Sequence, residues 1–198
     1  MTRPSIERSI ANLASLVASL PQDERSRFER IFDLNVTLGE VIPPSAMHPW
    51  ITSYFGSVDS VRHQRIVKVT NRVMLDGTLF NELRASRPQE APAGADDDLE
   101  ETVRESLGGP FCHPAEGTPT DSFGRVRGDW AVTASNVAKY DGWHGVIVFD
   151  EHHPLRFTAE QVSDYIDIAQ NWACRAHDAD PEARYPFFIW NCLWRSGA

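Results

Sequence analysis

The chain has 198 residues, 41% of them hydrophobic, which is enough to bury the core of one large domain or of somewhat more than one small domain. Its formal net charge of -9 at pH 7 argues against nonspecific binding to nucleic acid or to an anionic membrane, because both of these surfaces are negative themselves. The three cysteines lack the spacing of a disulfide scaffold, the N-terminus does not resemble a signal peptide, and no apolar run approaches the roughly 18 residues of a membrane span. We therefore expect a cytoplasmic protein with neither a nucleic-acid nor a membrane partner.

The N-terminal part of the sequence predicts helices. Apolar residues recur at three- and four-residue steps between Ser5 and Leu20, which is the stripe of an amphipathic helix. Pro21 opens a second helix, PQDERSRFERIFDL, with acidic residues in its first turn, and this pattern fades before Pro43. Residues 1–63 are therefore expected to form a helical N-terminal segment.

Strand signals follow. Residues 65–70 and 78–84 are rich in β-branched and aromatic side chains, and they flank the turn-forming pair Asp76-Gly77, as in a hairpin. Residues 86–101 combine proline, alanine and acidic residues, which predicts an exposed acidic linker.

The last third of the chain predicts strand, strand, helix and strand. Residues 123–136 and 144–155 read as two strands. Residues 158–178 form a helix in which Thr158 is the N-cap and Gln161 completes a capping box. Tyr185–Trp190 is the next expected strand, so the predicted fold class is α+β.

Four stretches carry a resemblance to a known family: GPFCHPAEGTP (109–119), FGRVRGDWAVTASNVAKYDGWHGVIVF (123–149), DEHHPL (150–155) and WNCLWRSGA (190–198). With the order of elements around them, they resemble the histidine triad (HIT-like) superfamily, especially the branch of galactose-1-phosphate uridylyltransferases and diadenosine polyphosphate phosphorylases. The resemblance covers roughly residues 64–198. It implies an incomplete HIT-like antiparallel sheet with one long packed helix, preceded by helices that match no family we can name.

The resemblance implies transfer of a nucleoside monophosphate from a sugar nucleotide or dinucleoside polyphosphate. In that superfamily a strand ends in an asparagine and runs through a glycine turn into a His-x-His segment, where one histidine attacks the α-phosphate and forms a covalent nucleotidyl intermediate. Asn191 and Gly197 match the asparagine and the turn glycine, but the sequence ends at Ala198, before the nucleophile. We therefore expect no catalytic residue in this chain and an inactive or crippled nucleotidyltransferase.

Two alternatives stay open beside that expectation. One is a non-catalytic nucleotide-binding or purely structural module that kept the scaffold. The other is a homodimer in which a second chain supplies the missing segment, because an open sheet edge favours pairing. The expected small-molecule partner is a nucleotide or sugar nucleotide.

The resemblance also names substrate-binding candidates, each with a plainer interpretation. Asn191 and Gly197 could contact phosphate or only form a turn, and His152 and His153 could line a pocket or lie on the surface. Arg125 and Lys139 could neutralise phosphate or be ordinary surface cations. The neighbouring Trp190 could stack on a base or belong to the core. These candidates are Asn191, His153, His152, Arg125, Lys139 and Gly197.

The resemblance also raises the question of a metal site. Cys112 and His153 match two zinc-ligand positions of the zinc-containing transferases, while Gly109 replaces the first cysteine of the usual pair. Structural zinc normally needs four ligands, so we expect no zinc and no other cofactor.

Overall fold

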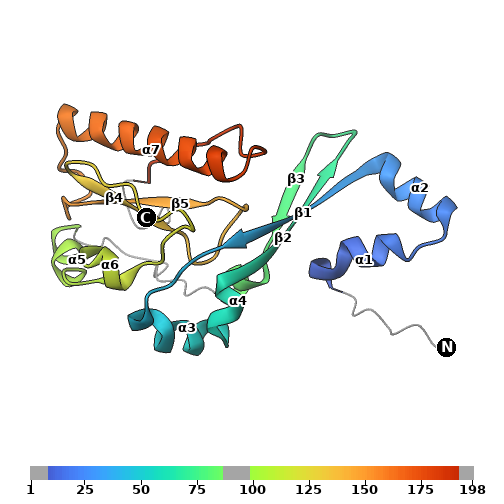
Figure 1. Cartoon of the computed structure of the whole chain (residues 1–198), viewed down its shortest axis with the longest axis horizontal. Coiled ribbons are helices and arrows are strands. Elements are labelled where there is room, and N and C mark those ends of the chain that lie inside the picture. Colours follow the sequence, from blue (N-terminus) through green and yellow to red (C-terminus); the bar gives the residue numbers. More distant parts are fainter. Residues whose placement is uncertain (1–8, 87–98, 192–198) are drawn as a thin grey trace.

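The computed structural model describes residues 9–86 and 99–191 (Figure 1). Two antiparallel sheets, one with the strand order β1-β2-β3 and one with the order β4-β5, are combined with helices along the described chain. The three-stranded sheet lies nearer the N-terminal helices, and the long helix α7 runs along the two-stranded sheet (Figure 1). The α+β class predicted from the sequence is confirmed.

The described chain opens with a 3-10 turn, η1 (Ile10–Asn12), and two short helices, α1 (Leu13–Ala18) and α2 (Gln22–Ile31). Helix α2 begins directly after Pro21 and has acidic residues in its first turn, where carboxylates interact favourably with the positive end of the helix. The two helices expected from the sequence are thus present, although both are shorter than the apolar stripes suggested.

Strand β1 (Phe32–Glu40) corrects the expectation of a helical segment up to residue 63. It pairs antiparallel with β2 (His63–Asn71) along its whole length. The apolar residues Leu34 and Val36 alternate with polar neighbours, a two-residue period that suits a strand and not a helix. The sequence pattern overextends the helix, because the last apolar residues of α2 run without a break into this alternation.

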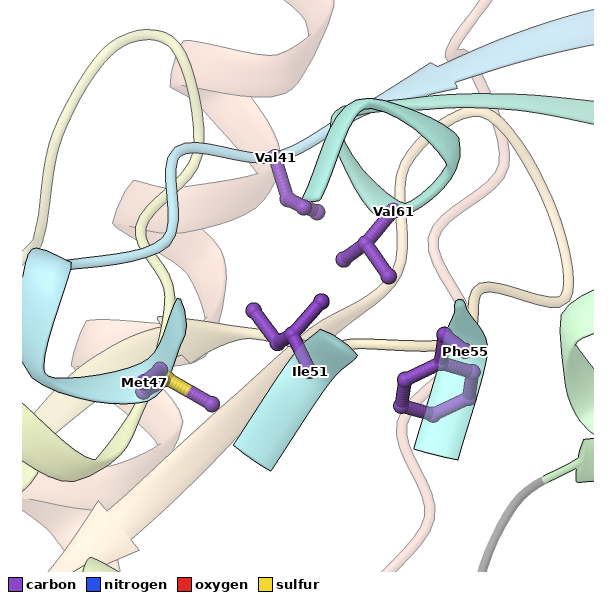
Figure 2. Packing of buried hydrophobic residues seen from close by; sticks show 5 residues of the cluster. All are labelled: Val41, Met47, Ile51, Phe55 and Val61. Carbon is purple, nitrogen blue, oxygen red and sulfur yellow. The ribbon is translucent and has the colours of Figure 1, made fainter. Parts of the chain in front are cut away.

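The chain then returns to helix in η2 (Ser45–Met47), α3 (His48–Phe55) and α4 (Val58–Arg62). A cluster of buried apolar side chains packs where these helices meet the end of β1 (Figure 2). We call this cluster the apolar core; it consists of Val41, Met47, Ile51, Phe55 and Val61.

The predicted hairpin is confirmed. β2 pairs antiparallel with β3 (Gly77–Phe80), and Thr70 lies opposite Gly77. The turn lies just before the expected Asp76-Gly77 pair, because Gly77 already begins β3, and the second strand ends at Phe80, earlier than the predicted run of residues 78–84. Leu75 in this turn has a φ of 62°, which lies in the left-handed region that residues other than glycine seldom adopt. A 3-10 helix, η3 (Glu82–Ser86), follows the hairpin.

The second sheet joins β4 (Ala131–Ser135) and β5 (Gly145–Phe149) in antiparallel register. Helix α7 (Ala159–Ala179) packs on it through Tyr165 and Ile168. All five residues of β4 are buried, so the short strand is covered on both faces. Both strands and the helix agree with the sequence-based prediction, although the strands are shorter.

The capping box of α7 is present as predicted. The Thr158 side chain accepts a hydrogen bond from the backbone N–H of Gln161, and the Gln161 side chain accepts one from the Thr158 backbone. Two otherwise unpaired N–H groups at the helix start are satisfied in this way.

Three short elements lie before the second sheet: α5 (Leu99–Glu105), η4 (Pro110–Cys112) and α6 (Pro114–Gly117). Most of the expected acidic linker, residues 87–98, lies outside the described residues. Its last part is helical, because α5 begins at Leu99.

The expected strand at Tyr185–Trp190 is not formed. These residues follow α7 without any regular structure, and Tyr185 and Phe187 are 92% and 85% exposed. Aromatic and β-branched composition favours a strand only where a neighbouring edge offers backbone hydrogen bonds and a surface to pack on. The segment packs through the Trp190 ring, which contacts Phe149 at the end of β5, Phe157 and Tyr165.

Candidate functional site

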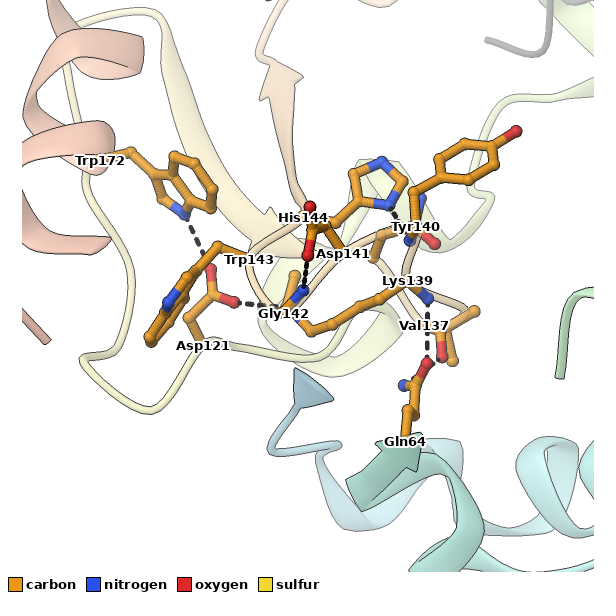
Figure 3. Close-up of polar contacts among 12 residues, drawn as sticks. Gln64, Asp121, Val137, Lys139, Tyr140, Asp141, Gly142, Trp143, His144 and Trp172 are labelled. Carbon is orange, nitrogen blue, oxygen red and sulfur yellow. Dashed lines mark hydrogen bonds and ion pairs between the residues drawn. The ribbon is translucent and has the colours of Figure 1, made fainter. Parts of the chain in front are cut away.

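Lys139 lies in the interior, in a polar cluster between the two sheets (Figure 3). Its Nζ is 3.2 Å from Asp121 Oδ1, and the two side chains are 0% and 1% exposed. The same carboxylate accepts hydrogen bonds from Ser135 Oγ at 2.6 Å and from Trp172 Nε1 at 2.8 Å. Burial lowers the pKa of Lys139, and the charge of Asp121 opposes that change.

The backbone around Lys139 is held by residues of the first sheet. Gln64 Oε1 accepts hydrogen bonds from the Lys139 N–H at 3.0 Å and from Asn81 Nδ2 at 2.8 Å, while Gln64 Nε2 donates to the Val137 carbonyl at 2.9 Å. Every donor and acceptor named here has a partner, which is what a buried polar group requires. We call this set the polar core. It links the two sheets and gives Lys139 a structural role, and it consists of Gln64, Asn81, Asp121, Ser135, Lys139 and Trp172.

Arg125 is also occupied by the protein itself. Its guanidinium donates to Thr118 Oγ1 and to the carbonyls of Thr133, Pro114 and Thr118, at 2.7–3.0 Å. Burial lowers the pKa of Arg125, and the nearby Asp121 opposes this change. Four of the five N–H donors of a guanidinium are thereby used to fix α6 against β4.

The paired histidines follow β5 and contact helix α5. His153 is buried; its Nε2 lies 3.1 Å from Glu100 Oε1, and its Nδ1 accepts a hydrogen bond from the Leu155 N–H at 3.2 Å. His152 Nε2 lies 2.9 Å from the Val103 carbonyl, and its Nδ1 lies 3.4 Å from Cys112 Sγ. The sequence places the histidines correctly after the strand, but it gives no signal that α5 is their partner.

The two metal-ligand candidates, Cys112 and His153, are not brought together. Cys112 faces His152, whereas His153 faces Glu100. Within residues 9–86 and 99–191, no group of three or more His, Cys, Asp or Glu side chains is arranged to hold a metal ion.

Asn191 is the last described residue and is exposed, and Gly197 lies outside the described residues. The preceding residue fixes where Asn191 lies. The centroid of the Trp190 ring is 5.4 Å from that of Phe149, 5.1 Å from that of Phe157 and 5.7 Å from that of Tyr165. Since Phe149 ends β5 and His152 and His153 follow directly, Asn191 belongs to the same end of the second sheet.

Two further features at this end of the two-stranded sheet are not indicated by the sequence. The Tyr165 hydroxyl is buried and has no hydrogen-bond partner among the described residues, and burial together with nearby carboxylates raises its pKa, so it stays protonated. Arg156 is exposed and lies 3.5 Å from Glu100 Oε1. A tyrosine in an amphipathic helix and an arginine in a loop carry no signal of such roles in the sequence.

The chain matches no protein-family model, no curated protein and no solved structure. The resemblance to the histidine triad superfamily therefore depends on the sequence motifs and remains a prediction. As for membranes, none of the helices in the described part of the chain is both long and apolar enough to cross one.

Proposed function

We propose that β4, β5, α7 and the segment up to Asn191 form a nucleoside-phosphate-binding module of the histidine triad type. The observation that carries this proposal is the packing of Trp190 on Phe149 and Tyr165, which brings Asn191 to the end of β5 that continues into His152 and His153. The resemblance requires this return of the chain to the sheet after the long helix, although the final segment is not a strand.

Three polar groups at this end support a ligand. The Tyr165 hydroxyl finds no acceptor among the described residues, and leaving such a group buried costs free energy unless something binds it. The amide of Asn191 is exposed and can donate to a phosphoryl oxygen. The pair between Arg156 and Glu100 is exposed, so an anionic ligand can compete with Glu100 for the guanidinium.

Binding, and not transfer, is what we propose for the described residues. Nucleophilic attack on phosphorus needs a histidine with a free, neutral nitrogen. Both ring nitrogens of His152 and of His153 already contact protein groups. The parent reaction, transfer through a nucleotidyl-histidine, is therefore not expected from either of them.

Thermal unfolding with added nucleotide tests the binding. A ligand that binds only the folded chain at about 100 times its Kd adds about 2.7 kcal/mol of stability, which raises Tm by roughly 5–10 °C for a chain of this size. We expect such a rise with at least one of a nucleoside diphosphate, a sugar nucleotide and a dinucleoside polyphosphate. No rise with any of them would contradict binding and favour a purely structural module.

Two variants locate the site. Asn191→Ala is expected to reduce the nucleotide-induced rise, whereas Asn35→Ala, an exposed asparagine on β1, is the matched control and is expected to leave it unchanged. Tyr165→Phe removes only the hydroxyl, which is buried without a partner in the described part of the chain, so we expect the free protein to keep or gain stability while the nucleotide-induced rise becomes smaller.

Transfer is tested separately. The protein is incubated with a labelled nucleotide donor, denatured, and analysed for acid-labile nucleotide on the chain. We expect no label, and stable labelling of this chain would overturn the proposal that it only binds.

A further inference from the structure

Cys112 and His152 form a pair that the nucleotide proposal does not use. The thiol of Cys112 is exposed at the end of η4, and its sulfur lies 3.4 Å from His152 Nδ1. The two residues come from segments that are far apart in the sequence, so the contact is made by the fold.

The surroundings of His152 determine which ring nitrogen carries a proton. Nε2 lies 2.9 Å from the carbonyl oxygen of Val103, and a carbonyl can only accept a hydrogen bond. Nε2 must therefore carry a hydrogen. In the neutral ring this leaves the lone pair on Nδ1, the nitrogen that faces the Cys112 sulfur.

Ser106 strengthens this arrangement. Its hydroxyl donates to the same Val103 carbonyl at 3.0 Å, and its oxygen lies 3.0 Å from His152 Nε2, where it can accept. The ring is thus oriented from one side by two oxygens of the α5 region, and its basic nitrogen is directed at the thiol. A nucleophile, a base and a group that orients the base are the parts of an activated thiol.

We propose that Cys112 is a site of modification by small-molecule disulfides, with His152 as the base. The thiol proton moves to His152 Nδ1, and the thiolate attacks one sulfur of the disulfide. The S–S bond of the reagent breaks, a mixed disulfide forms at Cys112, and the leaving thiolate takes the proton from the imidazolium. The disulfide is the oxidant and one of its halves leaves reduced, so electrons and protons balance.

Cys174 offers an internal comparison. It is also exposed, on helix α7, but its side chain makes no hydrogen bond to any residue that the structure describes. Since only the thiolate is the nucleophile, a base in hydrogen-bond contact with the Cys112 thiol, and with no counterpart in contact with Cys174 among the described residues, should separate their rates.

The test is the reaction of the full chain with glutathione disulfide at pH 7, followed residue by residue with peptide mass spectrometry. His152 can take the thiol proton of Cys112 as attack proceeds, and Cys174 has no such contact among the described residues, so we expect Cys112 to react about tenfold faster than Cys174. His152→Asn is expected to bring the Cys112 rate down to that of Cys174 while leaving Cys174 unchanged.

Denaturation provides a control that needs no variant. In urea the contact between Cys112 and His152 is lost, so the two cysteines are expected to react at similar rates. Equal rates in the folded chain, or a Cys112 advantage that persists in urea or in His152→Asn, would overturn the proposal. This outcome is independent of nucleotide binding, which is measured by the shift in Tm.

Discussion

The two buried clusters of this protein are built on different principles. The apolar core beneath the end of β1 consists of aliphatic side chains, one methionine and one phenylalanine, whose attraction has no preferred direction (Figure 2). The polar core between the sheets depends on an ion pair and on hydrogen bonds with fixed donors and acceptors (Figure 3). The stability of the apolar core should depend on the volume of its side chains, and that of the polar core on the presence of every hydrogen-bond and ion-pair partner.

The largest effect is expected in the polar core. Asp121→Ala leaves the Lys139 ammonium buried without a counter-ion, and removal of one partner of a buried pair typically costs about 3–5 kcal/mol. Urea unfolding measures this loss. The matched control is Asp33→Ala, which breaks an exposed pair with Arg72 and should cost less than about 1 kcal/mol. A loss from Asp121→Ala as small as that of the control would contradict the distinction between the two clusters.

The apolar core should respond to volume. Ile51 is 0% exposed, and Ile51→Ala is expected to lower the free energy of unfolding by about 2–5 kcal/mol, with Ile51→Val costing only about 0.5–1.5 kcal/mol. The same denaturation experiment measures both. If the valine variant were as unstable as the alanine variant, a simple volume effect would not explain this cluster.

A smaller effect is expected where β5 meets α7. A Cβ on Gly145 would lie 2.8 Å from the ring of Trp172, whose indole N–H donates to Asp121. Gly145→Ala should therefore cost about 1–3 kcal/mol through overpacking and a displaced indole. The measurement is the shift in Tm, and the contrasting variant is Gly77→Ala, where the nearest atom lies at 3.7 Å. Equal shifts for the two glycines would argue against the close approach.

The smallest predicted effect lies in neither cluster. Thr158→Ala removes the side-chain half of the capping box and should cost about 0.5–2 kcal/mol, whereas Thr158→Ser keeps the hydroxyl and should cost less. Equilibrium unfolding of both variants measures the difference. If the serine and alanine variants were equally stable, the hydroxyl would not be the stabilising group.

Local features of the fold were predictable from the sequence. The β2–β3 hairpin and the Thr158 capping box are specified by residues within a few positions of one another, and both are present. The errors occurred where a local pattern was ambiguous. β1 follows a helix without a breaking residue, and Tyr185–Trp190 has the composition of a strand but no strand partner in the described chain.

The candidate site was less predictable, because its contacts join distant segments. Arg125 and Lys139 were selected as cations near a pocket, yet both are held by partners that no local pattern identifies. In the same way, His152 and His153 were placed at the end of β5, but their contacts with α5 depend on tertiary packing. Sequence motifs located the residues, whereas the burial and the hydrogen-bond partners of each side chain could be learned only from the structure.

The most direct test of the account is a nucleotide titration of isotopically labelled protein, followed by NMR chemical shifts of the backbone amides. We predict that the shifts are concentrated in residues 150–156, at Tyr165 and at Asn191, and that the β2–β3 hairpin is unaffected. An absence of shifts, or shifts confined to the three-stranded sheet, would contradict a nucleoside-phosphate site at the end of β5.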